Sequence, residues 1–336
     1  MSVDAFFQRD TSCLVIGAGI AGLIAARELR RQGVRVTVLE KARGVGGRMA
    51  TRRYERGVFD HGTQYFAPAS PWFQSRIHEW EKEGVAQQWF KAGQYEMDPR
   101  FLSTSRYRGV PAMTAIPKYL ASGLDVLTSE RVARLYVESD RWRVVTEAGN
   151  HYAATSCILT PPLPQTLEIL ASSGIPLPGE ESRIKHIEYD SCIAVLAIFD
   201  HAPEFSEQGV LELNSGPVRR IMDNEKKGVS PGAHAITIHG SASFSKDMLD
   251  APTEDAGAAL LDHTLAHLNA RPVHWTTHVW RYCTVLNPDT ASYAVVSRQP
   301  ALVLAGDAFG SNGVEGAARS GMEAAHCIRR TLAGKS

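Results

Sequence analysis

Residues 13–40 read CLVIGAGIAGLIAARELRRQGVRVTVLE, and this stretch contains two strand-like runs on either side of a helix-like run. The apolar run 13–16 is typical of a buried strand, and residues 23–31 are typical of a helix. Residues 34–39 alternate in the manner of a second strand. A strand, a tight turn, a helix and a further strand form a βαβ unit, so the sequence predicts an α/β fold with a parallel sheet.

The turn in this unit has the G-x-G-x-x-G spacing of dinucleotide-binding proteins. Gly17 permits the tight turn, Gly19 lets the backbone approach a pyrophosphate, and Gly22 lets the helix pack closely on the sheet. The helix N-terminus, which includes Ile20 and Ala21, favours an anion through its free N–H groups and its dipole. These five residues are therefore expected to bind a dinucleotide.

The residues after the second strand extend this site. Glu40 is placed to accept hydrogen bonds from the ribose hydroxyls of an adenosine. Residues 41–48 read KARGVGGR and combine three glycines with two arginines, whose guanidinium groups suit a diphosphate. The expected cofactor contacts in this loop are Lys41, Arg43, Gly47 and Arg48.

A second glycine-rich region lies near the C-terminus. Residues 301–304 are typical of a buried strand, and Asp307 follows it in a position to bind a sugar-like hydroxyl chain such as ribityl. Residues 313–321 then begin a last helix, whose N-terminus is expected to face a group that becomes negatively charged. Its glycines, Gly316 among them, either approach that group or only allow close packing. The expected contacts are Gly306, Asp307, Gly313, Val314, Glu315 and Ala317.

Together these motifs resemble the flavin-containing amine oxidase superfamily, and within it the renalase group. The segment DHGTQYF (60–66) and the strand HVWRY (278–282) also match that group. The resemblance covers both ends of the chain well and the middle only thinly. It implies an FAD enzyme. We expect non-covalently bound FAD, because the motifs expected to contact the isoalloxazine ring contain no cysteine and, of histidines, His61 and His278. The resemblance adds five residues to the expected cofactor contacts: His61, Gly62, Thr63, Gln64 and Val132.

The resemblance also implies a reaction. Enzymes of the renalase group oxidise isomers of NAD(P)H reduced at C2 or C6 to NAD(P)+, and pass the electrons to O2 to give hydrogen peroxide. Loss of a hydride makes the dihydropyridine aromatic, so no proton must leave the substrate carbon. The expected work of the protein is therefore positioning, with the flavin supplying the chemistry.

The candidate catalytic residues come mainly from one strand. At a period of two residues, His278, Trp280 and Tyr282 share one face of the strand 277–283. Such a face either packs on the core or, as the resemblance favours, forms an aromatic wall that stacks a flat nicotinamide against the isoalloxazine ring. His239 is either a core histidine or a residue of the same cavity. The expected catalytic residues are His278, Trp280, Tyr282, His239 and Gln64.

Two discontinuous domains are predicted. The first is a Rossmann-type FAD-binding domain made of residues 1–66, 109–165 and 288–336. The second is an inserted α+β substrate domain, built on a mixed or antiparallel sheet, made of residues 67–108 and 166–287. Within it the charged segment 223–228, DNEKKG, is interpreted mainly as a solvated turn and alternatively as a substrate-facing loop.

Composition excludes several classes of protein. The 336 residues include 36 Lys and Arg and 36 Asp and Glu, and a net charge of zero disfavours a nucleic-acid partner. The longest nearly apolar stretch, 13–26, is shorter than the roughly 20 residues of a membrane span. Asp4, Arg9 and Asp10 argue against a signal peptide. The cysteines and histidines show no metal-ligand spacing. We expect a cytoplasmic protein without a metal or a membrane partner; the sequence does not indicate its oligomeric state.

Three alternative functions stay open. An amine oxidase of the same superfamily would take a hydride from a small neutral amine. A carotenoid-type desaturase would need an apolar surface that enters a membrane. A non-enzymatic binding protein with this fold would be expected to have lost its FAD motifs, all of which are present here. The colour of the purified protein separates the enzymes from the binding protein.

Overall fold

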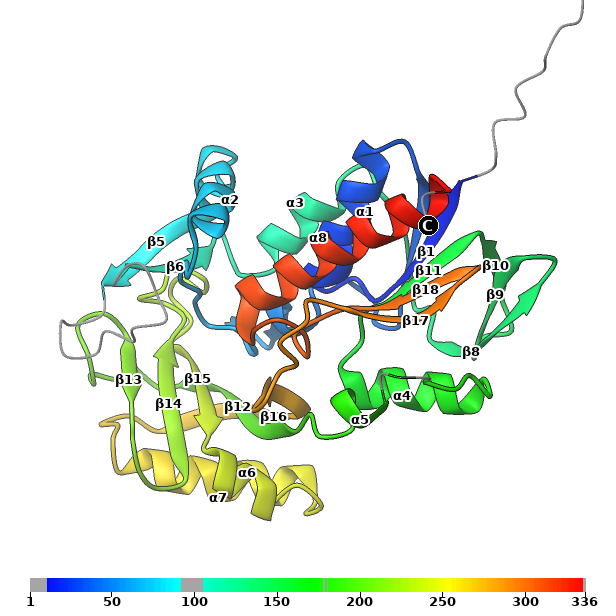
Figure 1. Cartoon of the computed structure of the whole chain (residues 1–336). Helices are drawn as coiled ribbons and strands as arrows, with labels where there is room; N and C mark the ends of the chain where they lie inside the picture. Colours follow the sequence, from blue (N-terminus) through cyan, green and yellow to red (C-terminus); the bar gives the residue numbers. More distant parts are fainter. Residues whose placement is uncertain (1–10, 92–104, 178, 180, 335–336) are drawn as a thin grey trace, which may run out of the picture.

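The structure is a computed structural model that describes residues 11–91, 105–177, 179 and 181–334 (Figure 1). The expectation drawn from Asp4, Arg9 and Asp10 lies outside these residues, as do the parts of the predicted domains at 1–10, 92–104 and 335–336. Two large sheets organise the described chain. One is mainly parallel and the other is antiparallel.

The six-stranded sheet forms the Rossmann-type part of the fold, and the sequence prediction of this part is confirmed. Its order is β17-β18-β11-β1-β2-β7, and β17 runs antiparallel to β18 while the other neighbouring pairs are parallel. The strands are β1 (Ser12–Ile16), β2 (Arg35–Glu40), β7 (Asp125–Thr128), β11 (Ser156–Leu159), β17 (Ala294–Arg298) and β18 (Ala301–Leu304). The helices on one face are α1 (Ile20–Arg31), α3 (Ala115–Ala121) and α8 (Gly313–Leu332).

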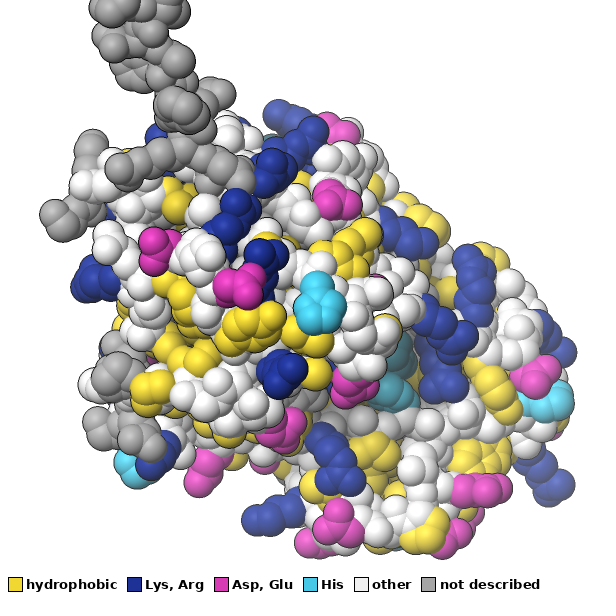
Figure 2. Space-filling view, turned by 90° about the vertical axis from the view of Figure 1, so that its right-hand side faces the viewer, with side chains coloured by type: hydrophobic (Ala, Val, Ile, Leu, Met, Phe, Trp, Pro, Cys, Tyr) yellow, Lys and Arg dark blue, Asp and Glu magenta, His cyan; other side chains and the backbone are white. Residues whose placement is uncertain are grey.

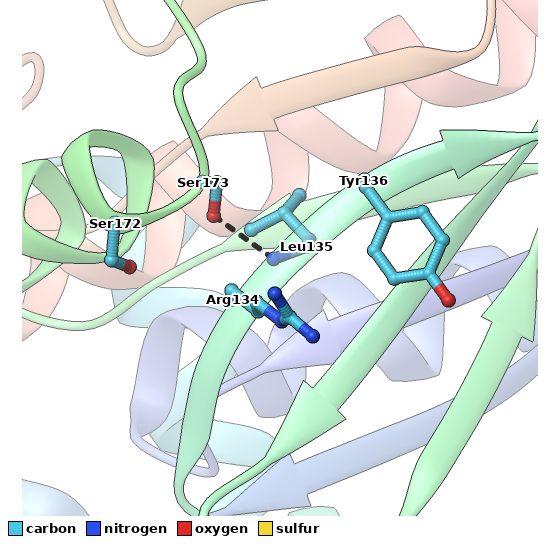
Figure 3. Close-up of a pocket in the computed structure, with 5 residues that line it drawn as sticks. All are labelled: Arg134, Leu135, Tyr136, Ser172 and Ser173. Atoms are coloured by element: carbon cyan, nitrogen blue, oxygen red, sulfur yellow. Dashed lines mark hydrogen bonds between the residues drawn. The ribbon is translucent and has the colours of Figure 1, made fainter.

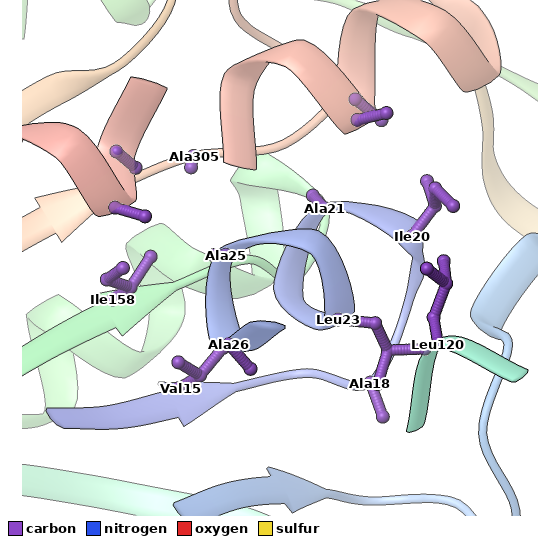
Figure 4. Close-up of a cluster of buried hydrophobic side chains, with 14 of the residues drawn as sticks. Val15, Ala18, Ile20, Ala21, Leu23, Ala25, Ala26, Leu120, Ile158 and Ala305 are labelled. Atoms are coloured by element: carbon purple, nitrogen blue, oxygen red, sulfur yellow. The ribbon is translucent and has the colours of Figure 1, made fainter. Parts of the chain in front are cut away.

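Strand β1 is apolar throughout because both of its faces are buried. Val15 lies in the cluster beneath the helices, whereas Leu14 lies in the cluster on the opposite face. Figure 4 shows small side chains, such as Ala21 and Ala25, on the packed side of α1. A Cβ atom at Gly321 would lie 2.1 Å from the Ala21 carbonyl oxygen, so α8 packs on α1 almost backbone to backbone.

A three-stranded antiparallel sheet covers the other face. It consists of β8 (Val132–Glu138), β9 (Arg141–Thr146) and β10 (His151–Ala154), and it is followed by α4 (Leu163–Ser172) and α5 (Glu181–Ile184). The β8–β9 hairpin turns at Ser139 and Asp140, which both have positive φ angles, of 49° and 56°. Such angles at both central positions suit a tight hairpin turn.

The second large sheet has five antiparallel strands in the order β13-β14-β15-β12-β16. They are β12 (Tyr189–Phe199), β13 (Val210–Glu212), β14 (Val218–Asp223), β15 (Ala235–Gly240) and β16 (Pro272–Val285). One face packs on α7 (Thr253–Leu265), with α6 (Ala242–Asp247) beside it (Figure 1).

The opposite face of this sheet meets the N-terminal part of the chain. Phe59 packs against Leu196 and Ala235 there. Phe59 belongs to the hairpin β3 (Thr51–Tyr54) and β4 (Gly57–Asp60), which follows the short 3-10 helix η1 (Gly47–Met49). The remaining elements are α2 (Pro71–Lys82), β5 (Ala86–Lys91) and β6 (Ser105–Gly109). The division into two domains at the predicted boundaries stays a prediction. Within the described ranges, no helix combines the length and the apolar character needed to cross a membrane.

Candidate functional site

The turn after β1 is held by Glu40. Ala18 N–H donates to Glu40 Oε2 at 2.7 Å, and Ala42 N–H donates to Oε1 at 2.8 Å. Gly17, with φ of 104°, donates its N–H to the Leu39 carbonyl oxygen at 2.8 Å. Each Glu40 oxygen has a second lone pair, which leaves an acceptor for the predicted ribose hydroxyls.

Gly19 and Gly22 have opposite surroundings. A Cβ atom at Gly22 would lie 2.0 Å from the Gly17 carbonyl oxygen, so Gly22 is needed for close packing. A Cβ atom at Gly19 would meet no atom within 4 Å. Gly19 is also the N-cap of α1, and no side chain caps this helix end. The first N–H groups of α1, at Ile20 and Ala21, therefore lie beside an open space, and this is where the sequence predicts the pyrophosphate.

The N-terminus of α8 resembles that of α1, because it too has open space beside a glycine. Its N-cap Asn312 does not cap the helix with its side chain, whose Nδ2 donates to the Val285 carbonyl oxygen at 3.4 Å. Gly313, with φ of 81°, again has no atom within 4 Å of a built Cβ. Gly316 differs, because its Cβ would lie 1.7 Å from the Ser311 carbonyl oxygen. Of the two roles that the sequence leaves open for Gly316, the structure supports close packing.

Other predicted contacts on α8 are placed as follows. The Glu315 carboxylate accepts a hydrogen bond from Ala69 N–H at 2.6 Å and pairs with Arg319 at 3.0 Å, so its side chain binds neighbouring protein groups. Val314 is half-buried, and Ala317 is buried. Only the backbone at Glu315 remains as a candidate cofactor contact.

Arg48 and Asp307 form a two-pronged ion pair. Arg48 Nη1 donates to Asp307 Oδ2 and Nη2 donates to Oδ1, both at 2.6 Å. Arg48 Nη1 also donates to the carbonyl oxygens of Tyr282, at 3.3 Å, and Cys283, at 3.0 Å. Tyr189 also lies near this ion pair, and burial, together with the Asp307 carboxylate, raises the pKa of its hydroxyl. The structure thus brings two predicted cofactor residues and the predicted aromatic strand β16 to one place.

The loop after β2 is mostly exposed. Lys41 Nζ donates to Gln165 Oε1 at 2.7 Å, and Arg43 is exposed. Gly47 adopts a left-handed φ of 53°, and a Cβ atom there would lie 3.5 Å from Gly19 Cα. Gly47 is therefore the residue of this loop that borders the open space at α1.

Three further predicted contacts lie around the same end of the sheet. Val132 is buried at the start of β8, close to the Glu130 N–H that donates to the Glu40 carbonyl oxygen at 2.8 Å. Gly306 N–H donates to Ser320 Oγ at 2.8 Å. Thr63 N–H donates to the Arg48 carbonyl oxygen at 2.8 Å, which joins the 60–66 segment to the arginine loop.

His61, His239, His278 and Trp280 meet in what we call the histidine–tryptophan cluster. The ring centroid of His278 lies 4.3 Å from that of Trp280 and 4.9 Å from that of His61. Trp280 Nε1 donates to the His61 carbonyl oxygen at 3.0 Å, and His239 Nε2 lies 3.1 Å from the same oxygen. Tyr282 lies next along β16, where its ring packs on Tyr189 at 5.7 Å.

The three histidines are held neutral. Burial, then the nearby Arg220, lowers the pKa of His239 to about 3. Burial, then His278 and Arg52, lowers the pKa of His61 to about 4. Burial and Arg52 also lower the pKa of His278. None of the three is therefore arranged to carry a positive charge at neutral pH.

Gln64 is buried and differs in role from the other candidate catalytic residues. Its Nε2 donates to the carbonyl oxygens of Asp60 and Gly62, and its Oε1 accepts from Lys227 Nζ at 3.3 Å. All these partners are protein groups, so Gln64 stabilises the loop that carries His61.

The interpretation of residues 223–228 as a solvated turn is wrong for half of the segment. Asp223, Asn224 and Lys227 are exposed by 2%, 0% and 1%. Asn224 and Lys227 pack beneath the hairpin that ends at Asp60, where Asn224 Oδ1 accepts from Asp60 N–H at 3.2 Å and Lys227 Nζ lies 2.7 Å from Asp60 Oδ2. The sequence carried no signal for this, because a run of charged and small residues has the same appearance whether a neighbouring element covers it or not.

A separate hollow of about 340 Å³ lies between β8 and the end of α4 (Figure 3). Its lining residues are Arg134, Leu135, Tyr136, Ser172 and Ser173. Ser173 Oγ accepts from Leu135 N–H at 2.9 Å across it. None of these residues was predicted to be functional. Among the side chains that the structure describes, no group of three or more His, Cys, Asp or Glu is arranged to hold a metal ion.

Comparisons with known proteins cover almost the whole chain. Residues 15–79 match the model of an NAD(P)-binding Rossmann-like domain, and residues 91–329 match that of the flavin containing amine oxidoreductases. Renalase of Mus musculus is 25% identical over 346 aligned residues, which cover 95% of this chain and 99% of the mouse protein.

Two other relatives match in part of the sequence or in fold. L-amino acid dehydrogenase of Synechocystis is 33% identical over 97 residues, which cover 26% of this chain and 21% of that protein. The solved structure of wild-type putrescine oxidase bound to putrescine superimposes with a TM-score of 0.67, at 16% identity, over 95% of this chain and 99% of that one. At that identity the likeness shows a shared fold.

Proposed function

The chain belongs to the family of flavin containing amine oxidoreductases, and from that premise we propose that it oxidises 2- or 6-dihydro isomers of NAD(P)H to NAD(P)+. It is a flavin-dependent oxidoreductase with FAD as its cofactor and a small molecule as its substrate. The proposal adds the nicotinamide dinucleotide isomer as the substrate. It also adds O2 as the electron acceptor, which gives hydrogen peroxide.

The charge around the histidine–tryptophan cluster is the observation that carries the proposal. Arg220, whose Nη2 lies 2.9 Å from Glu212 Oε1, acts on His239, and the exposed Arg52 acts on His61 and His278. Lys227 and the nearby Asp60 carboxylate form an ion pair that carries no net charge. On the face drawn in Figure 2, Lys and Arg side chains likewise lie beside a recess that contains histidine side chains. An amine is a cation in neutral solution and would be repelled, whereas a phosphorylated dinucleotide is an anion and would be attracted.

The residues of the chain have positioning roles in this proposal. Bound FAD supplies the oxidising chemistry, by accepting a hydride from the substrate and passing electrons to O2. The α1 N-terminus and Glu40 hold its pyrophosphate and ribose. His278, Trp280 and Tyr282 form a wall against which a flat nicotinamide stacks, and His239 closes one side. Neutral histidines suit this reaction, because hydride loss makes the ring aromatic and leaves no proton for a base to accept.

Rapid mixing under anaerobic conditions tests the substrate. At equal concentration, 2- or 6-dihydroNAD(P) should bleach the flavin much faster than putrescine or a monoamine does. Ordinary NAD(P)H should be a poor reductant, since its hydride lies on a different ring carbon. Reduction by amines within seconds, with no reduction by the isomers, would establish the amine oxidase alternative. A colourless protein that takes up no added FAD would instead point to a non-enzymatic binding protein. The cytoplasmic location and the predicted domain boundaries stay predictions.

A further inference from the structure

A buried ion pair lies directly behind the loop that carries His61. Lys227 Nζ is 2.7 Å from Asp60 Oδ2, and both side chains have an exposed fraction of 0%. Apart from this contact with the Lys227 ammonium, Oδ2 has no hydrogen-bond partner among the described residues. Burying two charges is costly, and separating them would leave each charge buried without compensation. The pair therefore restrains the two elements that carry it.

Asp60 is fixed through its other polar atoms as well. Its Oδ1 accepts hydrogen bonds from Met113 N–H at 2.9 Å and from Thr51 Oγ1 at 2.6 Å. Its N–H donates to Asn224 Oδ1 at 3.2 Å, and its carbonyl oxygen accepts from Thr237 Oγ1 at 3.1 Å. The end of β4 is therefore tied to β15 and to the turn after β14.

Lys227 reaches both ends of the loop formed by residues 61–64. While it pairs with Asp60 before the loop, its Nζ also donates to Gln64 Oε1 at 3.3 Å at the end of the loop. Gln64 in turn donates to the carbonyl oxygens of Asp60 and Gly62. One ammonium group thus links the two residues that determine where the loop lies.

The position of this loop sets the position of the cluster. The His61 carbonyl oxygen accepts from Trp280 Nε1 at 3.0 Å and lies 3.1 Å from His239 Nε2. The loop has little freedom to move without disturbing them, since a Cβ atom at Gly62 would lie 2.2 Å from the Arg48 carbonyl oxygen and 3.2 Å from Trp280 Cζ2.

We propose that Lys227 is a positioning residue: through Asp60 and Gln64 it fixes the His61 carbonyl oxygen, and thereby the orientation of Trp280 and His239 at the site where substrate meets the flavin. Its effect on the rate rests on the proposed function. Its effect on the Trp280 indole does not, because the hydrogen bond from Trp280 to His61 exists within the protein.

The proposal is tested by the NMR signals and the hydrogen exchange of the tryptophan indole N–H groups. The chain has six tryptophans, so protein labelled with ¹⁵N-tryptophan gives a simple spectrum in which Trp280→Phe identifies one signal. In Lys227→Met, with FAD bound, the Trp280 signal should shift and its N–H should exchange with water at least about tenfold faster, or about 1.4 kcal/mol. The Trp89 ring lies 5.1 Å from Lys227 Nζ, so a shift of its signal is expected on any account and decides nothing.

Lys226→Met is the matched control. Lys226 is the neighbouring lysine of the same turn, but it is exposed, and its Nζ donates to the Ser206 carbonyl oxygen at 2.7 Å. The substitution is the same, but Lys226 does not bind Asp60 or Gln64. The Trp280 signal and the rate of flavin reduction should therefore remain those of the wild type.

A double variant covers the case in which Lys227→Met does not fold. Loss of the ammonium leaves a buried carboxylate without compensation, whereas Lys227→Met with Asp60→Asn removes both charges. The double variant should fold and bind FAD, yet keep a displaced Trp280 signal and reduce its flavin at least tenfold more slowly per bound FAD. A wild-type Trp280 signal and a wild-type rate, with only a lower melting temperature, would overturn the positioning role.

The two proposals fail separately. If the isomers do not reduce wild-type flavin but the Trp280 signal still depends on Lys227, the proposed substrate is wrong and the positioning role holds. If the isomers reduce the flavin of the Lys227 variants at the wild-type rate and the Trp280 signal is unmoved, the substrate stands and the positioning role is wrong.

Discussion

The three histidines of the histidine–tryptophan cluster are unusual at the scale of single residues, because their surroundings favour the neutral form. The pKa of His239 is lowered to about 3 and that of His61 to about 4, and the pKa of His278 is lowered as well. Burial is the main cause in each case, and the cations Arg220 and Arg52 add to it. A histidine of ordinary pKa, about 6.5, would change charge within the working range of most enzymes.

We therefore predict that flavin reduction by the substrate is insensitive to the ionisation of His239 and His61 above about pH 5, where groups with pKa values of about 3 and about 4 are largely neutral. The measurement is the limiting rate constant for anaerobic reduction as a function of pH. An inflection near pH 6.5 that disappears in His239→Gln would show that His239 titrates normally and would contradict the prediction.

At the scale of elements, the turn between β1 and α1 separates two kinds of glycine. A Cβ at Gly22 would meet the Gly17 carbonyl oxygen at 2.0 Å, but a Cβ at Gly19 would meet nothing within 4 Å. Gly22→Ala should therefore destabilise the protein by about 1–3 kcal/mol, even without FAD, since the helix must move off the sheet. Gly19→Ala should leave the stability of the FAD-free protein nearly unchanged.

Gly19→Ala should instead weaken FAD binding at least tenfold, or about 1.4 kcal/mol, because the added methyl group occupies the space left for the pyrophosphate. Urea unfolding of the FAD-free proteins and titration with FAD measure the two effects, with Gly22→Ala as the reference for a packing defect. Wild-type FAD affinity in Gly19→Ala would show that the pyrophosphate does not approach this residue.

At the scale of the whole molecule, the buried histidines couple stability to pH. His239 and His61 bind a proton less readily in the folded chain, with pKa values of about 3 and about 4, than in the unfolded chain, at about 6.5. The unfolded state thus binds more protons in that interval. The contribution of these two histidines to the free energy of unfolding is therefore complete above about pH 6.5 and is lost as the pH falls toward about 3.

The urea midpoint should therefore fall as the pH is lowered from about 7 to about 4, and His239→Gln should reduce the size of that fall. Carboxylates add to the wild-type pH dependence, so the comparison of the two slopes is the decisive quantity. Equal slopes in the wild type and in His239→Gln would mean that His239 is not protonated on unfolding.

A second prediction at this scale concerns the attachment of FAD to the protein. The motifs expected to contact the isoalloxazine ring contain no cysteine, and their histidines are His61 and His278. We predict that FAD is not covalently linked. Acid precipitation should release all of the yellow colour into the supernatant, and flavin that stays with the washed pellet would contradict this.

The sequence by itself determined the features that depend on neighbours along the chain. The turn at Gly17–Gly22 and the alternation of β16 arise within a few tens of residues, where backbone geometry and periodicity suffice to predict them. The hydrogen bond from Ala18 N–H to Glu40 was visible only in the structure. Only the tertiary structure decided which distant groups meet. Arg48 reaches Asp307 across 259 positions, and Lys227 reaches Gln64 across 163. A charged turn such as 223–228 has no local property that tells a buried lysine from an exposed one. Whether Lys227 is buried depends on Asp60, a carboxylate on another element, which folding places opposite it.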